Sequence, residues 1–248
     1  MAAILEARDI HVRFGDRVVL EDIGFSVEEG ELHGIMGPNG AGKTTFFNVL
    51  TGRVKPARGS VRLDGEDVTG LASHKIAARG VARSFQIMTL FDEFTALENV
   101  EVALPEFRAR GFDARRSAVG DEGFESAARA VLAEVGLAEK ADAVARDLPY
   151  GDRRALEIAV ALAQRPRVLC LDEPTSGLGS DGVQRLASLV RRLKGRLSIV
   201  AIEHDMEFLF GLADRISVVH WGQVIARGTP AELKANAWVQ ASNLGRLQ

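Results

Sequence analysis

The sequence has a single cysteine, Cys170, among 248 residues. One thiol cannot form a disulfide within the chain, which suits a reducing compartment such as the cytosol. The sequence also lacks any apolar run near the roughly 20 residues that a membrane-spanning helix needs. Residues 1–9 mix acidic and apolar side chains and lack the basic-then-apolar order of a signal peptide. We therefore expect a soluble protein without a disulfide framework or a membrane span.

Charge of one sign is not in large excess either. The chain has 31 Lys and Arg and 34 Asp and Glu, which gives a formal net charge of −3 at pH 7. Proteins that bind nucleic acid or anionic membranes usually present a positive surface. The composition gives no general argument for either partner, and we expect no nucleic-acid ligand. The length suits one large domain, or a core with a subdomain.

A glycine-rich segment separates a predicted strand at residues 32–36 from a predicted helix at residues 44–50. It fits the phosphate-binding pattern G-x-x-x-x-G-K-[ST], in which backbone N–H groups and the start of the helix face phosphate oxygens. Lys43 is expected to reach the β- and γ-phosphates of a nucleotide, and the Thr44 hydroxyl to coordinate Mg²⁺. The expected nucleotide-binding residues here are Gly37, Pro38, Asn39, Gly40, Ala41, Gly42, Lys43, Thr44 and Thr45.

A second motif is acidic. Residues 168–171 are apolar and run into Asp172 and Glu173, the pattern of a buried strand that delivers a carboxylate to the metal of a phosphate loop. Asp172 is expected to act on Mg²⁺, directly or through water, and Glu173 to polarise the attacking water as a base. Two acids solvated at a strand end are the simpler alternative. Cys170, inside the same strand, is interpreted as a small core residue.

Strand and helix patterns alternate along the rest of the chain, which favours an α/β fold with a β-rich edge and an inserted helical block. Predicted strands lie at residues 23–27, 61–63, 81–85 and 198–202, with a hairpin of 216–219 and 223–226. Predicted helices lie at residues 73–80, 124–135, 153–164 and 183–193. Capping boxes at Thr95 and Thr229 open two more helices. The polar stretch 104–123 is interpreted as a solvated loop or a frayed helix pair.

The segment 148–152, Leu-Pro-Tyr-Gly-Asp, ends 20 residues before Asp172 and is followed by a predicted helix. In that position it resembles the signature motif of ABC-type ATPases, and nearly the whole chain resembles the nucleotide-binding subunit of an ABC transporter. The resemblance implies a P-loop ATPase core with an antiparallel β-subdomain and an inserted α-helical subdomain. It implies a single cassette over residues 1–248: β-subdomain and P-loop core at 1–86, helical subdomain at 87–165, and Walker B and switch core with a C-terminal tail at 166–248.

The same resemblance assigns further roles. Phe14 matches the aromatic residue that stacks on adenine, and Gln86 the glutamine that senses Mg²⁺ and the attacking water. His204 matches the switch histidine that contacts the γ-phosphate. Gly151 matches a signature glycine whose amide binds ATP held by a second subunit. Glu173, His204 and Gln86 are then the expected catalytic residues, and ATP and Mg²⁺ the expected cofactors.

Four positions depart from the family pattern, three in the signature motif and one in the motif that follows the acidic strand end, which the family calls Walker B. Pro149 has neither the hydroxyl nor the N–H that the family uses to bind the γ-phosphate across the dimer. Tyr150 replaces a glycine, Asp152 a glutamine, and Gly179 the aspartate that couples the two sites. ATP binding is expected to survive, while engagement across the dimer is expected to be weaker. The alternative to this weaker engagement is that Tyr150 supplies a replacement hydroxyl.

Several phrases resemble importers of branched-chain amino acids and their urea or amide relatives, among them residues 83–86, 97–100, 156–159 and 202–206. Implied partners are a second ABC ATPase subunit, identical or paralogous, two transmembrane permease subunits and, indirectly, a periplasmic solute-binding protein. The implied location is the cytoplasmic face of the inner membrane, with the surface of Phe91, Phe94 and Glu98 meeting the permeases. Charge reversal at Glu98 is then expected to uncouple transport from hydrolysis.

Other classes remain open at this point. Soluble ABC ATPases of ribosomes usually carry two such domains in one chain, and those of DNA repair insert long coiled coils; neither feature occurs in this sequence. A regulatory subunit that binds ATP but barely hydrolyses it is favoured by the altered signature and opposed by intact Lys43, Asp172, Glu173 and His204. A GTPase is disfavoured because no Asn/Thr-Lys-x-Asp motif follows the phosphate loop.

Replacing Pro149 by Ser restores a hydroxyl and an N–H to the signature turn. If their absence weakens contact with ATP on the second subunit, Pro149→Ser will raise ATP hydrolysis by about 10-fold, the equivalent of one hydrogen bond to a charged group. It will also strengthen ATP-dependent dimerisation. Phosphate release and sedimentation measure the two effects, and the hypothesis fails if both are unchanged.

Overall fold

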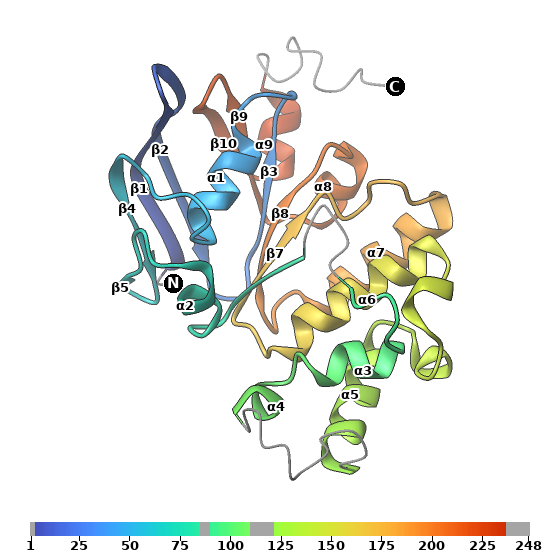
Figure 1. The fold of residues 1–248 in the computed structure, drawn as a ribbon. Helices are drawn as coiled ribbons and strands as arrows, with labels where there is room; N and C mark the ends of the chain where they lie inside the picture. The colour runs from blue at the N-terminus through green and yellow to red at the C-terminus, as the bar shows by residue number, and fades with distance from the viewer. Residues whose placement is uncertain (1–2, 85–89, 110–121, 237–248) are drawn as a thin grey trace.

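The computed structural model describes residues 3–84, 90–109 and 122–236, which form two β-sheets and two groups of helices (Figure 1). An antiparallel sheet has the strand order β2-β1-β4-β5. Its strands are β1 (Ala3–Phe14), β2 (Arg17–Glu28), β4 (Arg58–Leu63) and β5 (Glu66–Asp67). The second sheet has six strands in the order β10-β9-β3-β8-β7-β6. These are β3 (Leu32–Met36), β6 (Val81–Ser84), β7 (Val168–Asp172), β8 (Ser198–Ile202), β9 (Arg215–His220) and β10 (Gln223–Gly228).

The helices in chain order are α1 (Lys43–Leu50), α2 (Ser73–Ala77), α3 (Ala96–Glu101), α4 (Pro105–Ala109), α5 (Glu122–Glu134), α6 (Tyr150–Ala163), α7 (Ser180–Leu193), α8 (Met206–Leu212) and α9 (Pro230–Ala235). Two short 3₁₀ helices, Ala138–Lys140 and Ala145–Asp147, lie between α5 and α6. Within the described ranges, no helix is both long and apolar enough to cross a membrane. The predicted fold class, an α/β core with an antiparallel sheet and an inserted helical block, is confirmed.

Parallel pairing in the second sheet brings the carboxyl ends of five strands to one edge. β3 pairs with β8 and β9, and β7 pairs with β6 and β8, all in parallel. Ile202 is opposite both Ile35 and Asp172 in the register. The residues that follow β3, β7 and β8 therefore begin at the same height. Ligands of open α/β sheets bind at this carboxyl edge, which makes it the place to look for a site.

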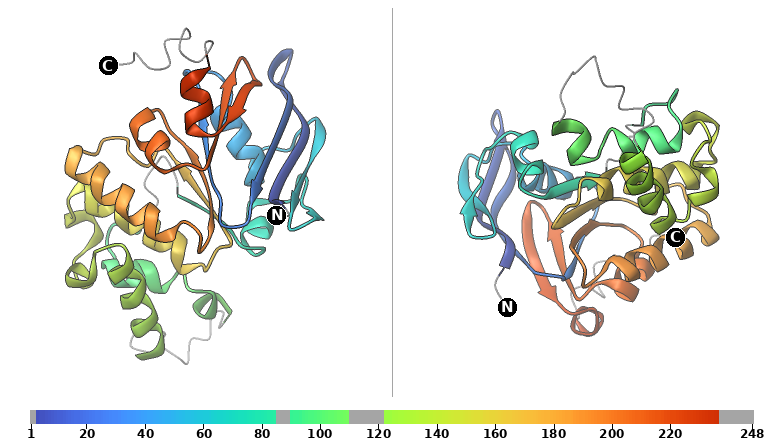
Figure 2. Two further views of the ribbon diagram at one scale, coloured as in Figure 1. Left: turned by 180° about the vertical axis from the view of Figure 1, so that it is seen from behind. Right: turned by 90° about the horizontal axis from the view of Figure 1, so that it is seen from below.

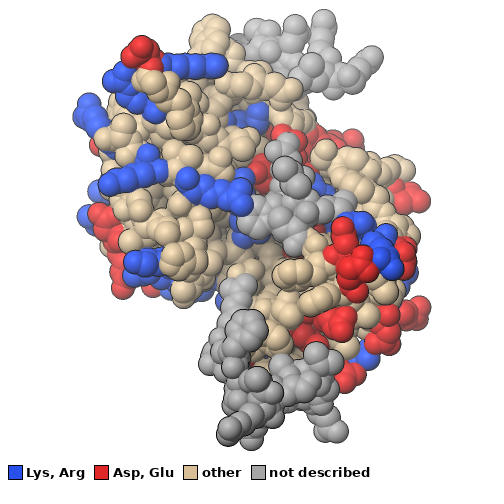
Figure 3. Space-filling view, viewed as in Figure 1, with Lys and Arg blue, Asp and Glu red and all other residues tan. Residues whose placement is uncertain are grey.

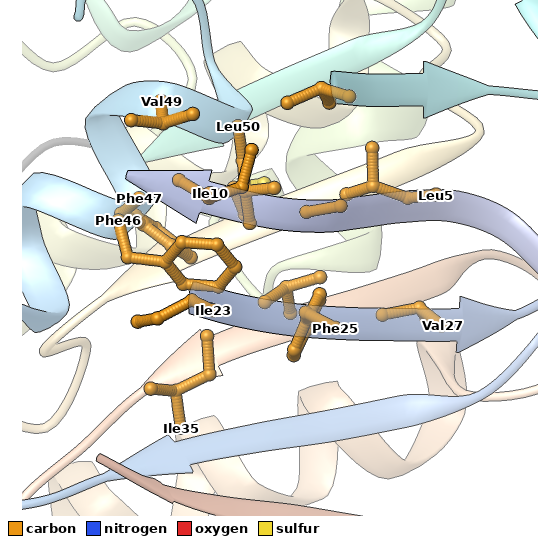
Figure 4. Close-up of a cluster of buried hydrophobic side chains, with 14 of the residues drawn as sticks. Leu5, Ile10, Ile23, Phe25, Val27, Ile35, Phe46, Phe47, Val49 and Leu50 are labelled. Atoms are coloured by element: carbon orange, nitrogen blue, oxygen red, sulfur yellow. The ribbon is translucent and has the colours of Figure 1, made fainter. Parts of the chain in front are cut away.

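Helix α1 is held between the two sheets. Its Phe46 and Phe47 are fully buried, and the ring of Phe46 meets Phe25 of β2 edge-on with centroids 5.3 Å apart. Figure 4 shows these side chains meeting apolar residues of β1, β2 and β3, including Ile35. Burial of each phenylalanine contributes about 1.5–3 kcal/mol. The core therefore fixes the position of Lys43, the first residue of this helix.

The opposite face of the second sheet is covered by α6, α7, α8 and α9, whose apolar residues form one cluster with those of β3, β7, β8 and β9. Helices α3, α5 and α6 form a separate core around Val100, Leu132 and Leu156. Seen from below, this helical block (residues 96–163) stands on one side of the second sheet and the antiparallel sheet on the other (Figure 2, right). In the view of Figure 3, Lys and Arg gather over the antiparallel sheet and α1, and Asp and Glu over the helical block.

Most predicted elements are found, with differences at their ends. Both capping boxes are present: Thr95 with Glu98, and Thr229 with Glu232. Helix α6 begins at Tyr150, three residues earlier than predicted, because Pro149 is its N-cap and the helix continues through the signature turn. The stretch interpreted as a loop or frayed pair includes α4 and the start of α5, and its residues 110–121 lie outside the described ranges.

Strand β1 was not predicted as a defined range. Its pairing with β2 shifts register four times, and Asp9 within it has a φ of 50°. Such bulges interrupt the alternation of apolar and polar residues by which a strand is recognised in sequence.

Three buried polar side chains, Glu31, His33 and Ser217, contact one another in that order at the amino end of β3. His33 is fully buried, with its Nε2 2.9 Å from Ser217 Oγ and its Nδ1 3.2 Å from Glu31 Oε1. Burial lowers the pKa of His33, with the charges of Arg227 and Arg215 adding to this shift and the Glu31 carboxylate opposing it. The order Glu, His, Ser is that of a hydrolytic triad. Its complete burial in the core marks it as structural.

Because the pKa of His33 is lower in the folded protein, the unfolded chain takes up the proton first as the pH falls. The free energy of unfolding should therefore decrease as pH falls below the ordinary histidine pKa near 6.5, by up to ~1.4 kcal/mol per pH unit. Urea denaturation at pH 7.5 and 5.5 measures this change. His33→Gln removes the titrating group and should flatten the dependence; an equal slope in both proteins would contradict the assignment.

Candidate functional site

The phosphate loop, residues 37–44, leaves the carboxyl edge of the second sheet between β3 and α1. Two of its glycines are required by close approach and by backbone angle. Gly37 has a φ of 154°, and a Cβ there would lie 2.0 Å from the carbonyl oxygen of Val219. Gly42 has a φ of 100°, and a Cβ would lie 2.7 Å from the side chain of Leu20. Any larger residue would push the loop off the sheet edge.

Lys43 is buried against this loop. Its Nζ donates to the carbonyl oxygens of Gly37 at 2.8 Å and Pro38 at 2.9 Å. Burial lowers its pKa, while the carboxylates of Glu173 and Asp172 oppose that shift. The preceding Gly42 makes no side-chain cap, so the first N–H groups of α1 are directed out of the helix toward a possible anion. The ammonium and these N–H groups suit the phosphates of a nucleotide.

A surface cavity of ≈ 330 Å³ opens beside the loop. It is lined by Phe14, Arg17 and Val19 on one side, by Asn39, Gly40, Gly42, Lys43, Thr44 and Thr45 of the loop and helix, and by Glu173. Phe14 is 55% exposed, so its ring is not a core residue. An exposed aromatic ring at the mouth of a phosphate site is placed to stack on a flat base. Arg17 was not predicted, because nothing in its local sequence marks it.

Asp172 ends β7 and is buried. Its Oδ2 accepts a hydrogen bond from Arg83 Nη2 at 2.5 Å, and Arg83 also donates to Asn48 Oδ1 at 2.7 Å and Thr51 Oγ1 at 3.2 Å. The guanidinium lies 5.0 Å from the centre of the Phe47 ring. Arg83 thus ties the carboxylate to helix α1, and it compensates a charge that is costly to bury. Arg83 lies in the segment 83–86 that resembles the importers, but the sequence predicts no role for it.

The other oxygen of this carboxylate, Asp172 Oδ1, is buried and has no hydrogen-bond partner in the described part of the chain. A carboxylate oxygen with no donor suits a cation or a water bound to one. The described residues contain no group of three His, Cys, Asp or Glu that could hold a metal by themselves. Mg²⁺ is usually held by one or two carboxylates, waters and nucleotide phosphates. Gln86, the other expected metal residue, lies outside the described residues.

Glu173 has a φ of 46°, a conformation that non-glycine residues rarely adopt. The turn is held at both ends: the N–H of Glu173 donates to Ile202, and its carbonyl oxygen accepts from Arg154 Nη2 at 2.9 Å. Strain of this kind costs about 1–3 kcal/mol and is typical of functional sites. The Oε1 atom of Glu173 lies 2.9 Å from Nε2 of His204, so the two predicted catalytic residues are neighbours.

The described residues of the signature turn do not line this cavity. Gly151 lines a separate cavity of ≈ 90 Å³ between α6 and α7. A Cβ at Gly151 would come no closer than 3.7 Å to Arg185 and Leu178, so packing within the subunit does not require a glycine there. Tyr150 donates from its hydroxyl to the carbonyl oxygen of Ser176 at 3.0 Å. Its ring covers Gly177, where a Cβ would be 2.9 Å away.

Most predicted site residues therefore meet at one place. Phe14, the phosphate loop, Asp172, Glu173 and His204 surround the carboxyl edge of the second sheet, and Gly151 does not join them. Residues without a predicted role are Arg17, Arg83, Arg154 and Glu203, each brought to the site by the fold. Cys170 is buried in β7, where burial raises its thiol pKa to about 12, as expected for a core residue. Together these features define a P-loop nucleotide-binding ATPase.

Comparison with known proteins agrees with this class. Residues 20–176 match the family described as ABC transporter. The chain is 41% identical over 252 residues to the high-affinity branched-chain amino acid transport ATP-binding protein BraF of Pseudomonas aeruginosa, with 98% of each chain covered. It is 38% identical over 249 residues to the corresponding protein LivG of Salmonella typhimurium, again with 98% of each covered.

Two solved structures extend the comparison. The ADP conformation of MJ1267, an ATP-binding cassette of an ABC transporter, has a TM-score of 0.88 at 26% identity and covers 99% of this chain and 100% of its own. The dimeric cassette MJ0796 bound to ADP and Pi has a TM-score of 0.77 at 25% identity and covers 91% of this chain and 98% of its own. The chain belongs to the ABC transporter family, as an ATP-hydrolysing cassette. The predicted family resemblance is confirmed.

Removal of Arg83 should leave the Asp172 carboxylate buried without its counter-charge. Breaking a buried pair in this way costs about 3–5 kcal/mol, so Arg83→Met should lower the free energy of unfolding by that amount. Urea denaturation of the full chain measures it. The double variant Arg83→Met/Asp172→Asn removes both charges and should recover most of the loss; a double variant no more stable than Arg83→Met would contradict this account.

Proposed function

We propose that this chain is the ATPase subunit of an importer that takes up branched-chain amino acids or a related small polar solute. The observation that carries the proposal is full-length similarity, 37–41% identity, to ATP-binding proteins named for high-affinity branched-chain amino acid transport. The solute is inferred from kinship, because the cassette itself binds nucleotide. As a subunit of such an importer it would lie at the cytoplasmic face of the inner membrane.

In the proposed mechanism, Lys43 and the N–H groups at the start of α1 hold the β- and γ-phosphates. Thr44 and Asp172, with Gln86, would hold Mg²⁺, which neutralises charge on the phosphates when bound. Glu173 accepts a proton from the attacking water, and its neighbour His204 contacts the γ-phosphate. The 2.9 Å contact between Glu173 and His204 supports these two roles, because it places the proposed base beside the residue proposed to contact the γ-phosphate.

A second copy or paralogue is proposed to complete the site through its signature turn. Gly151 supports this, because its own subunit leaves room for a side chain there. A glycine at such a position is explained by close approach of something outside the subunit. The hydroxyl proton of Tyr150 is committed to Ser176 within the same chain, which disfavours Tyr150 as a substitute for the family's serine. Weaker engagement across the dimer therefore remains the proposal for this turn.

The proposed docking surface for two permease subunits is a groove of ≈ 500 Å³ between the second sheet and the helical block. It is lined on one side by Thr51 and Arg53, which follow α1, and by Ile76 of α2. On the other side it is lined by Phe91, Val102 and Val160. Phe91 is 57% exposed and stacks on Phe94 with ring centroids 5.0 Å apart. Arg83 also lines this groove and donates a hydrogen bond to Asp172, so one side chain connects the proposed docking surface with the proposed metal-binding carboxylate.

Glu98 is a poorer test of this surface than the sequence indicated. Its carboxylate accepts from the N–H of Thr95 at 2.7 Å and from the Thr95 hydroxyl at 3.1 Å. Charge reversal would break this capping box and loosen the start of α3, at a cost of ~1 kcal/mol. Phe91 is exposed at the groove and makes a cleaner substitution.

The decisive experiment reconstitutes the chain with its permease subunits and solute-binding protein in vesicles and measures uptake of radiolabelled leucine together with ATP hydrolysis. Glu173→Gln should lose both activities by at least about 100-fold, since it removes the proposed base. Phe91→Ser should retain hydrolysis by the isolated subunit and lose uptake. Hydrolysis without leucine uptake would point to another solute, whereas ATP binding with little hydrolysis and no uptake would point to the regulatory alternative. Full uptake by Phe91→Ser would exclude this groove as the docking surface.

A further inference from the structure

A third acidic residue lies behind Glu173 and His204. Glu203 follows β8 directly and is 2% exposed. Its Oε1 accepts a hydrogen bond from the N–H of Thr175 at 2.7 Å. Its Oε2 accepts from the N–H of His204 at 2.8 Å and of Asp205 at 3.1 Å. One carboxylate therefore holds two separate loops by their main chains.

These two loops carry the proposed catalytic side chains. Thr175 lies two residues after Glu173, at the carboxyl end of β7, and His204 follows Glu203 itself. The N–H of Glu203 donates in turn to the carbonyl oxygen of Ile35 at 3.2 Å, which anchors it to β3. Glu203 thus touches the ends of β3, β7 and β8, the three strands whose loops surround the nucleotide cavity.

The negative charge of Glu203 is met by backbone N–H groups, and in the described ranges no Lys, Arg or His side chain forms an ion pair with it. Burying a carboxylate is costly unless several donors face it. A neutral apolar side chain would fill the same space without that cost, but it could not bond two loops at once. The arrangement is explained by the need to fix the loops relative to each other.

We propose that Glu203 is a positioning residue for ATP hydrolysis. It holds the loop of Glu173 and the loop of His204 at the separation that keeps their side chains 2.9 Å apart. The inference rests on the roles of Glu173 and His204 in the proposed function. Glu203 itself is buried below these side chains and acts through them.

Glu203→Gln tests the proposal with almost no change in size. The amide has one accepting oxygen and an NH₂ group that cannot accept, so at least one of the three N–H donors loses its partner. The two loops should then separate slightly. Small misplacements of reacting groups lower rates strongly, and we expect kcat for ATP to fall by about 10- to 100-fold with KM changed less than about 2-fold. Glu207→Gln, an exposed neighbour on α8, is the matched control and should hydrolyse ATP normally.

Two further measurements separate positioning from a loss of stability. The imidazole ¹⁵N shifts of His204 should change in Glu203→Gln, because the ring loses its fixed contact with Glu173. In a His204→Ala background, Glu203→Gln should lower kcat by less than about 2-fold further, since the effects of residues that act as a unit are not additive.

Glu203→Asp keeps the charge but is too short to reach both loops, and it should also lower kcat. This variant keeps the test available if Glu203→Gln folds poorly.

The outcomes are distinguishable. Wild-type hydrolysis by Glu203→Gln, with Glu173→Gln inactive, overturns the positioning role and leaves the proposed function intact. Hydrolysis by Glu173→Gln at the wild-type rate overturns the proposed roles on which the inference rests. Equal losses from Glu203→Gln in the wild-type and His204→Ala backgrounds, with unchanged His204 shifts, overturn the inference as well.

Discussion

Parallel pairing of β3, β8 and β7 is the constraint on which the rest of this structure depends. Ile202 lies opposite Ile35 on one side and Asp172 on the other, so three strands end at the same height. The phosphate loop, the turn at Glu173 and the loop at His204 start from those ends and meet although they are far apart in sequence. A slip of one residue in either pairing would turn every following side chain to the opposite face of the sheet. The register of the sheet therefore determines which side chains of the three loops meet at the site.

Three buried charges at this edge bind across chain segments. Arg83 joins β6 to β7 and α1, Arg154 joins α6 to the turn at Glu173, and Glu203 joins the ends of β7 and β8. Buried ionic groups add little net stability compared with apolar residues, but they fix geometry because their bonds are directional. Their concentration at the carboxyl edge indicates that geometry there is held by polar contacts, whereas α1 is held by aromatic packing.

The parts of the site that sequence predicts are those encoded locally. The phosphate loop and the acidic strand end are short patterns whose chemistry is contained in consecutive residues, and the structure places both at the carboxyl edge of the second sheet. Arg83 and Glu203 could not be assigned in the same way, because Asp172 is 89 residues from Arg83 and Thr175 is 28 residues from Glu203, and only the fold brings each pair together. The same reason applies to Arg17. In the fold, the sequence pattern does not predict β1, because its bulges disturb the alternation of a strand. The predicted start of α6 is three residues late, because the signature turn is already helical.

The contact between Tyr150 and residues 176–177 has a mechanical consequence. Tyr150 is the first residue of α6, and the segment it touches leads into α7, so one hydrogen bond and one ring contact latch the starts of two long helices together. Rotation of the helical block about this point must either drag α7 with it or release the latch. Releasing one neutral hydrogen bond costs about 1 kcal/mol. This contact therefore adds little to the energy of any such rotation, and its direction from hydroxyl to carbonyl defines one relative position of the two helix starts.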